Sequence, residues 1–378
     1  MTTGGAPRVL HLHSTFSPGG KELRCVQLIN AFGPQLAHTV VSAEPGALGA
    51  AERISRNATV AVQPEFPSLT GAPTPWRLFS LARAMKGYDL VLTYNWGAMD
   101  AVMAHRMFGG VLRLPPLIHH EDGFDESERD RRSPKRNAYR RLAVTAADML
   151  VVPSATLETI ARDEWGCPAR RIRRIPNGID TAAFVSPPDP AAIPGLRKTS
   201  EVRWVGTLAG LRPVKNLPRL VRAFAALAPE WELVICGEGP ERDAIAAAAK
   251  EAGIAGRVHL PGNVPEPAKV MGLFDIFALS SDSEQFPISV VEAMAAGLPV
   301  CAPEVGDIAA MLAGPNRANL AAQRTDAALS ASLAAFAEDP QLRADVGRAN
   351  RAKAQQSFGQ DGMIAAYSAL YFGAMDRA

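Results

Sequence analysis

The sequence predicts an α/β fold of two Rossmann-like, doubly wound domains, and three observations point to it. Short apolar runs of strand length alternate with amphipathic stretches of helical length. The alternation occurs in two blocks, and a proline-rich stretch separates them. This pattern is typical of parallel sheets covered by helices on both faces, and two such domains facing each other bind ligands in the cleft at the carboxyl ends of their strands. The 378 residues and 47% hydrophobic content fit two large cores and exclude a disordered chain.

Ten short apolar runs follow one another along the chain and are predicted to be strands. They are Arg8–His13, Thr39–Ser42, Asp89–Thr93, Leu117–His120, Asp148–Pro153, Glu201–Val205, Glu232–Cys236, Arg257–Leu260, Asp275–Leu279 and Pro299–Ala302. Amphipathic spacing predicts helices between many of them, for example at Lys21–Ala31, Leu217–Ala228 and Pro240–Ala252. Strands and helices thus alternate in the order that parallel sheets require.

The domain boundaries follow from the same pattern. Residues 181–200 contain four prolines and little periodicity, so we expect a linker there. One domain then covers residues 1–180 and the second covers residues 201–354. The final stretch, residues 355–378, has helical spacing, and this C-terminal helix could pack back on the N-terminal domain.

Composition excludes several classes of protein. The four cysteines lie far apart without a CxxC pair, which argues against zinc clusters and thioredoxin-like chemistry and fits a reducing compartment. A net charge of only +2 gives no global attraction to nucleic acid. No apolar run is long enough to span a membrane, and Met1–Arg8 lacks the pattern of a secretory signal. We expect a soluble, cytoplasmic protein that could touch the inner membrane from that side.

The segment from Glu284 to Gly297 carries the strongest functional signal. Pro287 suits the first position of a helix that ends before Gly297, and the start of that helix would offer free amides and a positive dipole end to an anion. Glu284 precedes the helix and Glu292 lies within it, so the two carboxylates could hold sugar hydroxyls on either side of a diphosphate. The alternative is that both are solvated acids, since glutamates at this spacing are common.

At these residues the chain resembles the retaining glycosyltransferases of the GT4 type, which have the GT-B fold, and among them enzymes of exopolysaccharide assembly. Glu284 and Glu292, followed by AMAAGLPV, resemble the family signature. Four further motifs agree in order: GGKE at 19–22, PNGID at 176–180, VGTL at 205–208 with RPVKN at 212–216, and CGEGP at 236–240. The resemblance covers nearly the whole chain, and the C-terminal half is the more specific part.

The resemblance implies a donor site in the C-terminal half. Arg212 and Lys215 would bind the donor diphosphate, Glu292 the ribose, and Glu284 the hydroxyls of the transferred sugar. The remaining donor-side candidates are Gly206, Thr207, Gly237, Gly262, Asn263, Val264, Gln285, Phe286, Pro287, Ile288 and Ser289. Phe286–Pro287 stands where the family usually has a glycine after the first glutamate, so the donor stays open between a UDP-sugar, the first choice, and a GDP-sugar.

Metal and cofactor are not expected. The sequence has no DxD motif, and no cluster of histidine, cysteine or carboxylate has metal-ligand spacing. Charge on the leaving diphosphate must still be stabilised, which Arg212 could do as a fork and Lys215 as a point charge. The alternative is that these are two solvated surface cations.

The N-terminal half is predicted to bind the acceptor. Leu117–His120 is a strand end whose continuation, HHEDG, resembles the family's HxEHG, with Asp122 in place of the second histidine. Either histidine could orient the acceptor or hydrogen-bond the sugar, or could be a core residue. The acceptor-side candidates are Gly19, Gly20, Glu22, Asn95, Trp96, His119, His120 and Glu121, with His119 and His120 also counted as catalytic candidates beside Arg212, Lys215 and Glu284. Trp96 could stack on a sugar or cover the core.

The stretch 129–141 holds seven cations and one acid. It could be a solvated helix face, or it could dock on an anionic inner membrane, where a lipid-linked acceptor would be found. Nucleic acid is a less suitable partner, because several acids adjoin the stretch and no nucleic-acid-binding motif is present.

We therefore predict a hexosyltransferase that moves a sugar from a nucleotide diphosphate to a hydroxyl acceptor, a glycan or lipid-linked intermediate, with retention and without a metal. A UDP-sugar 2-epimerase of the same fold is one alternative, which conversion of donor alone would favour. A non-catalytic scaffold that binds nucleotide sugar or membrane is another, which tight donor binding without turnover would favour.

Overall fold

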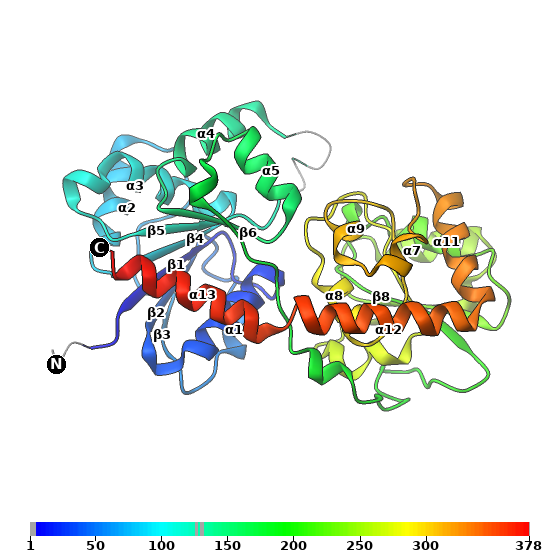
Figure 1. The fold of residues 1–378 in the computed structure, drawn as a ribbon. Helices are drawn as coiled ribbons and strands as arrows, with labels where there is room; N and C mark the ends of the chain where they lie inside the picture. The colour runs from blue at the N-terminus through cyan, green and yellow to red at the C-terminus, as the bar shows by residue number, and fades with distance from the viewer. Residues whose placement is uncertain (1–4, 125–127, 129–131, 378) are drawn as a thin grey trace. The chain divides into compact units, whose positions relative to one another are not determined.

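The computed structural model describes residues 5–124, 128 and 132–377. Its contacts divide the chain into two compact units, Met1–Asn177 together with Asp361–Ala378 (unit 1), and Gly178–Gln360 (unit 2). Each unit contains a parallel sheet with helices on both faces (Figure 1). The predicted α/β class with two Rossmann-like sheets is confirmed.

Unit 1 is built on a seven-stranded parallel sheet in the order β3-β2-β1-β4-β5-β6-β7. Its strands are β1 (Arg8–His13), β2 (Ala37–Ser42), β3 (Thr59–Val62), β4 (Leu90–Tyr94), β5 (Leu117–His120), β6 (Met149–Val152) and β7 (Ile172–Arg174). The order reverses between β1 and β4, and at such a switch point the loops at the carboxyl ends of the strands diverge and leave room for a ligand.

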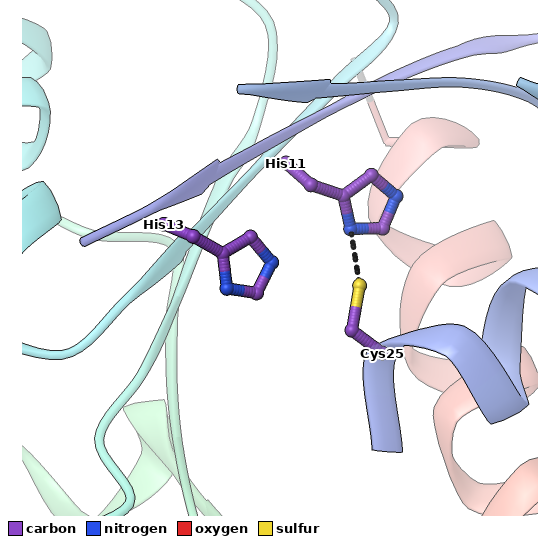
Figure 2. A group of neighbouring side chains, drawn as sticks. All are labelled: His11, His13 and Cys25. Carbon is purple, nitrogen blue, oxygen red and sulfur yellow. Dashed lines mark hydrogen bonds between the residues drawn. The ribbon is translucent and has the colours of Figure 1, made fainter. Parts of the chain in front are cut away.

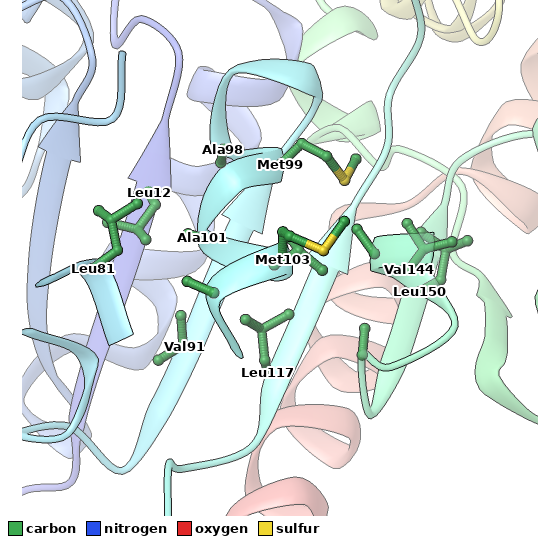
Figure 3. Packing of buried hydrophobic residues seen from close by; sticks show 14 of the residues in the cluster. Leu12, Leu81, Val91, Ala98, Met99, Ala101, Met103, Leu117, Val144 and Leu150 are labelled. Atoms are coloured by element: carbon green, nitrogen blue, oxygen red, sulfur yellow. The ribbon is translucent and has the colours of Figure 1, made fainter. Parts of the chain in front are cut away.

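Two layers of helices cover this sheet. On one face lie α2 (Pro75–Met85), α3 (Met99–Leu112), α4 (Pro134–Val144) and α5 (Ala155–Asp163). Figure 3 shows the core of this layer, in which Leu12, Val91 and Leu117 of the strands pack against Leu81 and Met103 of the helices. The opposite face is covered by α1 (Gly20–Phe32) and α13 (Gln360–Met375).

The C-terminal helix therefore belongs to unit 1. Met363, Tyr367 and Tyr371 of α13 share a buried cluster with Val9 and Leu92. The chain passes between the units twice, once after Asn177 and once after Gln360.

Unit 2 has a five-stranded parallel sheet in the order β10-β9-β8-β11-β12. Its strands are β8 (Arg203–Leu208), β9 (Trp231–Cys236), β10 (Val258–Gly262), β11 (Ile276–Ala278) and β12 (Val300–Cys301). Its helices are α6 (Leu217–Phe224), α7 (Arg242–Glu251), α8 (Ile288–Ala295), α9 (Ile308–Met311), α10 (Gly314–Arg317), α11 (Asp326–Glu338) and α12 (Pro340–Ser357). One face buries α8 and α12 and the other buries α6, α7 and α11.

The segment predicted as a linker, residues 181–200, is part of unit 2 instead. Phe184 and Ile193 are buried in the same cluster as Trp204 of β8. Its prolines interrupt regular structure, but Phe184 and Ile193 anchor it to the core on one face of the sheet, so it is packed against unit 2 and is not a free tether. None of the helices in the described ranges is long and apolar enough to cross a membrane.

Candidate active site

The carboxyl edge of the unit 2 sheet brings together the loops that follow β8, β9, β10 and β11. The glycines after β9 allow two of these loops to touch. A Cβ on Gly237 would lie 1.9 Å from the carbonyl oxygen of Ala209, and one on Gly239 would lie 2.4 Å from that of Leu211. Both have φ near +155°, where a side chain is strained. The β9 loop thus seats directly against the loop that carries Arg212 and Lys215.

Lys215 and Glu284 meet at this edge. The Lys215 Nζ donates to Glu284 Oε1 at 2.5 Å, and the Ser281 hydroxyl donates to the same oxygen at 2.7 Å. The Ser280 hydroxyl donates to the backbone carbonyl of Lys215 at 2.9 Å. The second carboxylate oxygen of Glu284 has no such contact among the described residues, so it can accept a ligand hydroxyl.

A second ion pair fixes the loop that carries Glu284. Arg219 of α6 lies 2.7 Å from Asp282 and also donates to the carbonyl of Ser280. Arg324 donates to the carbonyl of Asp282 at 2.9 Å. Sequence reasoning missed these residues, because only the pairing of β8 with β11 brings them together. Arg219 and Arg324 fix the position of the loop, so Lys215 is not needed for that purpose and can contact a ligand.

Arg212 differs from its neighbour. Its side chain is exposed, and its guanidinium pairs with no carboxylate of the described residues, although its aliphatic part lies beside Gly210. Arg212 directly precedes the short 3₁₀ turn Pro213–Lys215, and α6 follows that turn. An unpaired cation at a sheet's carboxyl edge is available to an anionic ligand.

The start of α8 has the uncapped geometry predicted for an anion site, with one correction. The helix begins at Ile288, so Pro287 is the residue before the helix and not its first residue. No side chain caps it, and within the described structure the amides of Ile288 and Ser289 have no protein acceptor, as expected of a first helical turn. These two N–H groups can bind an anion.

The side chains that precede this helical turn differ in their surroundings. Phe286 is buried and packs edge-on against Phe358 at 5.5 Å, so only its backbone can face a ligand. The buried Gln285 side-chain oxygen has no hydrogen-bond donor among the described residues. A Cβ on Gly306 would lie 2.1 Å from the carbonyl oxygen of Glu284, so Gly306 also supports the loop.

Glu292 lies one turn inside α8 and is half-buried. Burial raises its pKa from 4.5 to about 7, and no cation of the described residues compensates it. An acid that costs stability in this way is a candidate for ligand binding.

Most of the remaining donor-side candidates lie within strands or contact neighbouring loops. Gly206 and Thr207 are buried within β8, and a Cβ on Gly206 would lie 2.2 Å from the Phe274 ring. Gly262 ends β10, and its carbonyl accepts from the amide of Gly237 at 2.8 Å. Exposed Asn263 and partly buried Val264 follow it at the carboxyl edge.

The acceptor-side candidates lie in unit 1, at the carboxyl ends of β1, β4 and β5. Gly19 is the residue before α1, and Gly20 begins that helix. A Cβ on Gly19 would lie 2.7 Å from the Glu22 carboxylate. Glu22 itself is buried and pairs with Lys21, and burial raises its pKa despite that pairing. The glycine thus makes room for the acid.

Asn95 and Trp96 follow β4. Asn95 has φ of +53° and accepts from the amide of Asp122 at 2.8 Å, which links the ends of β4 and β5. Trp96 lies under two guanidinium groups, those of Arg136 and Arg140, at 4.9 and 5.1 Å. It packs against the core below α3 and α4, which favours the covering role over sugar stacking.

The two histidines of β5 point to opposite faces of the sheet and have different surroundings. His120 donates from Nδ1 to the carbonyl of Thr93 at 3.2 Å and accepts at Nε2 from the Tyr371 hydroxyl at 3.0 Å. Burial, with the charge of Arg24, lowers its pKa to about 3. Both nitrogens of His120 are occupied, so its environment is that of a structural residue.

His119 retains a free nitrogen. Its Nδ1 lies 2.8 Å from the Thr93 hydroxyl, and its Nε2 has no hydrogen-bond partner among the described residues, although it lies 3.8 Å from the Glu121 carboxylate. Glu121 is buried and accepts no hydrogen bond from the described residues, but its carboxylate forms an ion pair with Arg140 Nε at 3.6 Å. Both histidines are fully buried, and of the two only His119 has a ring nitrogen without a hydrogen-bond partner among the described residues.

Asp122, which replaces a family histidine, has a defined role. It pairs with the buried guanidinium of Arg24, which also donates to Asn177 at 2.8 Å. Burial opposes ionisation of Asp122, but the charge and hydrogen bonds of Arg24 outweigh it and lower its pKa. Sequence reasoning missed Arg24, which joins three distant segments at one sheet edge.

The basic stretch 129–141 is not a uniform solvated face. Arg129 and Arg131 lie outside the described residues. Arg140 is fully buried and binds Glu128 through two hydrogen bonds of 3.0 and 2.7 Å, while Arg136 pairs with the same acid and Arg132 with Glu164. Lys135 and Arg141 are exposed.

Comparison with known proteins agrees with this architecture. Residues 18–183 match the family described as Glycosyltransferase Family 4, and residues 192–353 match the family described as Glycosyl transferases group 1. The N-acetyl-alpha-D-glucosaminyl L-malate synthase of Bacillus anthracis is 23% identical over 285 residues, which are 73% of this chain and 71% of that protein. The GDP-mannose-dependent alpha-mannosyltransferase of Mycobacterium tuberculosis is 29% identical over 255 residues, 64% of this chain and 62% of that protein.

Solved structures share the fold. Anabaena Alr3699/HepE in complex with UDP superposes with a TM-score of 0.78 at 21% identity, covering 96% of this chain and 98% of that one, and the same protein in complex with UDP-glucose gives 0.75, covering 96% and 99%. Both halves of the chain match families of sugar transferases, and the whole matches the two-sheet architecture of such enzymes. The chain therefore belongs to the GT4-type glycosyltransferases with the GT-B fold.

Proposed function

We propose that the protein moves a hexose-type sugar from a nucleotide diphosphate to a hydroxyl of a glycan or lipid-linked acceptor, with retention and without a metal in the donor site. A UDP-sugar is the first candidate donor, since the HepE structures hold UDP and UDP-glucose. A GDP-sugar is the second, since one relative is named for GDP-mannose.

The observation that carries the proposal is the contact between Lys215 and Glu284 at the carboxyl edge of the unit 2 sheet. The ammonium group can neutralise a phosphate. The second Glu284 oxygen and the neighbouring Gln285 oxygen, which have no hydrogen-bond partner among the described residues, can accept sugar hydroxyls. Arg212 and the two α8 amides supply the further positive groups that a departing diphosphate requires.

The same contact bears on the reaction course. One oxygen of Glu284 accepts hydrogen bonds from the Lys215 ammonium and the Ser281 hydroxyl. This suits a residue that binds sugar hydroxyls better than it suits an attacking nucleophile. The bond from the anomeric carbon to the phosphate oxygen would break as the acceptor oxygen bonds to the same face of the sugar. The released phosphate oxygen would take the acceptor proton, so no protein nucleophile is needed.

His119 is the proposed acceptor-side residue, because its buried Nε2 has no hydrogen-bond partner among the described residues and would become available if the end of β5 opened to an acceptor. His120 would have a structural role, because its two ring nitrogens form hydrogen bonds with the Thr93 carbonyl and the Tyr371 hydroxyl. The His119→Ala variant should lower turnover and raise the acceptor KM while leaving donor affinity unchanged. Unchanged turnover would remove His119 from the reaction.

The donor site is tested with the variant that combines Arg212→Gln and Lys215→Gln. Thermal-shift screening against UDP- and GDP-sugars first identifies the donor, and product NMR reports the anomeric configuration. Loss of one such electrostatic contact typically costs about 10²–10³ in rate, so the double variant should lose at least that. The matched control is Arg222→Gln, an exposed arginine of α6 that pairs with Asp326.

The outcomes separate the alternatives. Turnover that survives the double variant contradicts the proposed role of Arg212 and Lys215 in the donor site. Turnover that a chelator abolishes contradicts the absence of a metal from that site. The chelator is applied to the Cys25→Ser variant, which lacks a candidate metal ligand of unit 1. Conversion of donor alone into an epimer supports the epimerase. Tight donor binding without turnover on any glycan or lipid acceptor supports the scaffold.

We also propose that unit 1 contacts an anionic membrane, through a wider surface than residues 129–141. Helices α2, α3 and α4 lie on one face of its sheet (Figure 1). They and the residues that follow them carry these exposed cations: Arg83, Lys86, Arg106, Arg113, Lys135 and Arg141. The same helices expose Trp76 (77%), Val111 (86%) and Leu142 (54%). Each cation near an anionic surface contributes about 1 kcal/mol.

Sedimentation with vesicles tests this surface. Binding should require anionic lipid and should weaken in the Val111→Asp variant, whereas Val185→Asp, at an exposed apolar residue of unit 2, is the matched control. Binding that ignores lipid charge, or that both variants retain equally, would refute it.

A further inference from the structure

A buried group of metal-ligand side chains lies in unit 1, apart from the residues assigned above. His11 and His13 project from the same face of β1, and Cys25 comes from the second turn of α1 (Figure 2). One ligand atom from each lies within 4.8 Å of the other two, and all three residues are buried. Sequence reasoning missed this group, because the histidines and Cys25 come together only when α1 packs back over β1.

His13 is the least satisfied member. It is fully buried, and neither ring nitrogen has a hydrogen-bond partner among the described residues. Its ring stacks on Tyr94 at 3.9 Å and meets the edge of Phe16 at 4.9 Å. Burial lowers its pKa well below the usual value, so the imidazole is neutral and offers a lone pair. A buried polar group without a partner costs about 1–3 kcal/mol unless something fills the gap.

His11 and Cys25 are already spaced as two ligands of one ion. Cys25 Sγ lies 3.3 Å from His11 Nδ1, shown by the dashed line in Figure 2. Tetrahedral zinc, with Zn–S of about 2.3 Å and Zn–N of about 2.0–2.1 Å, places such atoms about 3.5 Å apart. An ion could therefore replace the S–H···N contact with little movement of either side chain.

The surroundings supply the outer contacts of a metal site. The other nitrogen of His11, Nε2, lies 2.9 Å from Nδ1 of His38, which fixes the ring as partners of metal-bound histidines do. The Tyr94 hydroxyl lies 3.1 Å from His11 Nδ1 and 3.8 Å from Cys25 Sγ, so it is the nearest group for a fourth position.

We propose that His11, His13 and Cys25 bind one Zn²⁺ ion, which fastens α1 to β1 beside the Gly19–Gly20 loop. One thiolate with two imidazoles suits a borderline-soft divalent ion. The ion displaces the proton of the Cys25 thiol, which leaves to solvent as the Zn–S bond forms. The nearby cations Lys21 and Arg24 are each paired with an acid, Glu22 and Asp122, so they add little net charge.

Zinc titration of the full chain against a chromophoric chelator tests the proposal, after removal of bound metal. The wild type should bind one Zn²⁺ per chain in this site, with release of one proton, and Cys25→Ser should lose that equivalent. His38→Ala should weaken binding by about 10- to 100-fold. Cys167→Ser, at another buried cysteine of unit 1, is the matched control and should bind as the wild type does.

The His13→Phe variant guards against a folding artefact. Phenylalanine keeps the stacking on Tyr94 and removes the unpaired nitrogens, so the metal-free variant should fold at least as stably as the wild type and yet bind no zinc. Cobalt(II) should give a thiolate charge-transfer band in the wild type and none in Cys25→Ser. A wild type that binds no more zinc than Cys25→Ser overturns the proposal. Donor binding to Cys25→Ser, measured separately, reports on unit 2 alone.

Discussion

Replacing Glu292 with glutamine should stabilise the free protein and weaken its grip on the donor. Burial raises the pKa of Glu292 from 4.5 to about 7. Between those values the unfolded chain has lost a proton that the folded protein keeps, so stability falls as the pH rises through this window. At 1.36 kcal/mol per pH unit the loss is at most about 3 kcal/mol. Since the side chain is half-buried, solvent screening reduces it to about 2 kcal/mol.

Scanning calorimetry and donor titration measure the two effects. At pH 8 the Glu292→Gln variant should melt about 4–8 °C above the wild type, at about 2–4 °C per kcal/mol for a unit of this size. Well below pH 4.5 the two should melt together, because the wild-type carboxyl is then protonated in both the folded and the unfolded state. Loss of a charged hydrogen bond to ribose, about 1.5–3 kcal/mol, should weaken donor affinity about 10- to 100-fold.

The matched control is Glu251→Gln, at an exposed glutamate in the last turn of α7, which should change neither property. Equal melting of Glu292→Gln and wild type at pH 8 would refute the burial argument. Higher stability with unchanged donor affinity would keep that argument and remove Glu292 from the ribose site.

Three further substitutions test the packing around the candidate sites by urea unfolding. Gly206→Ala should cost about 1–3 kcal/mol, because its Cβ would lie 2.2 Å from the Phe274 ring, and an unchanged midpoint would contradict this. Arg140→Met should cost about 3–5 kcal/mol, because buried Glu128 loses two short charged hydrogen bonds and keeps the longer contact with Arg136, and adding Glu128→Gln should restore most of it. Tyr371→Phe should cost about 1–3 kcal/mol, because the buried Nε2 of His120 loses its hydrogen-bond donor. Equal stability of variant and wild type would refute that role.

Hydrophobic patterning located the buried strands and missed the exposed ones. Each of the ten predicted runs overlaps a strand, since central strands of parallel sheets are apolar on both faces. The strands β3 and β7 were not predicted. They lie at the two edges of the unit 1 sheet, and their side chains are mostly exposed, so they have no apolar run to detect.

The candidate site was predictable where it depends on local sequence. The glycine turn after β9 and the uncapped start of α8 follow from residues next to one another in the chain. The direction of the Phe286 side chain and the pairing of Arg219 with Asp282 depend on which strands are neighbours, which the sequence does not state. The burial of Arg140 within the basic stretch was not predictable for the same reason, since the fold places it beside acids that the linear pattern separates from it.

The double passage of the chain between the units has a consequence for how the protein matures on the ribosome. All of unit 2 is synthesised before α13, the helix that closes one face of the unit 1 core. The first 177 residues must therefore wait with Tyr94 and His120 uncovered until the final helix emerges. A fragment that ends at Asn177 would lack α13 and would expose this aromatic surface, so a single cut in the gene does not separate the two units.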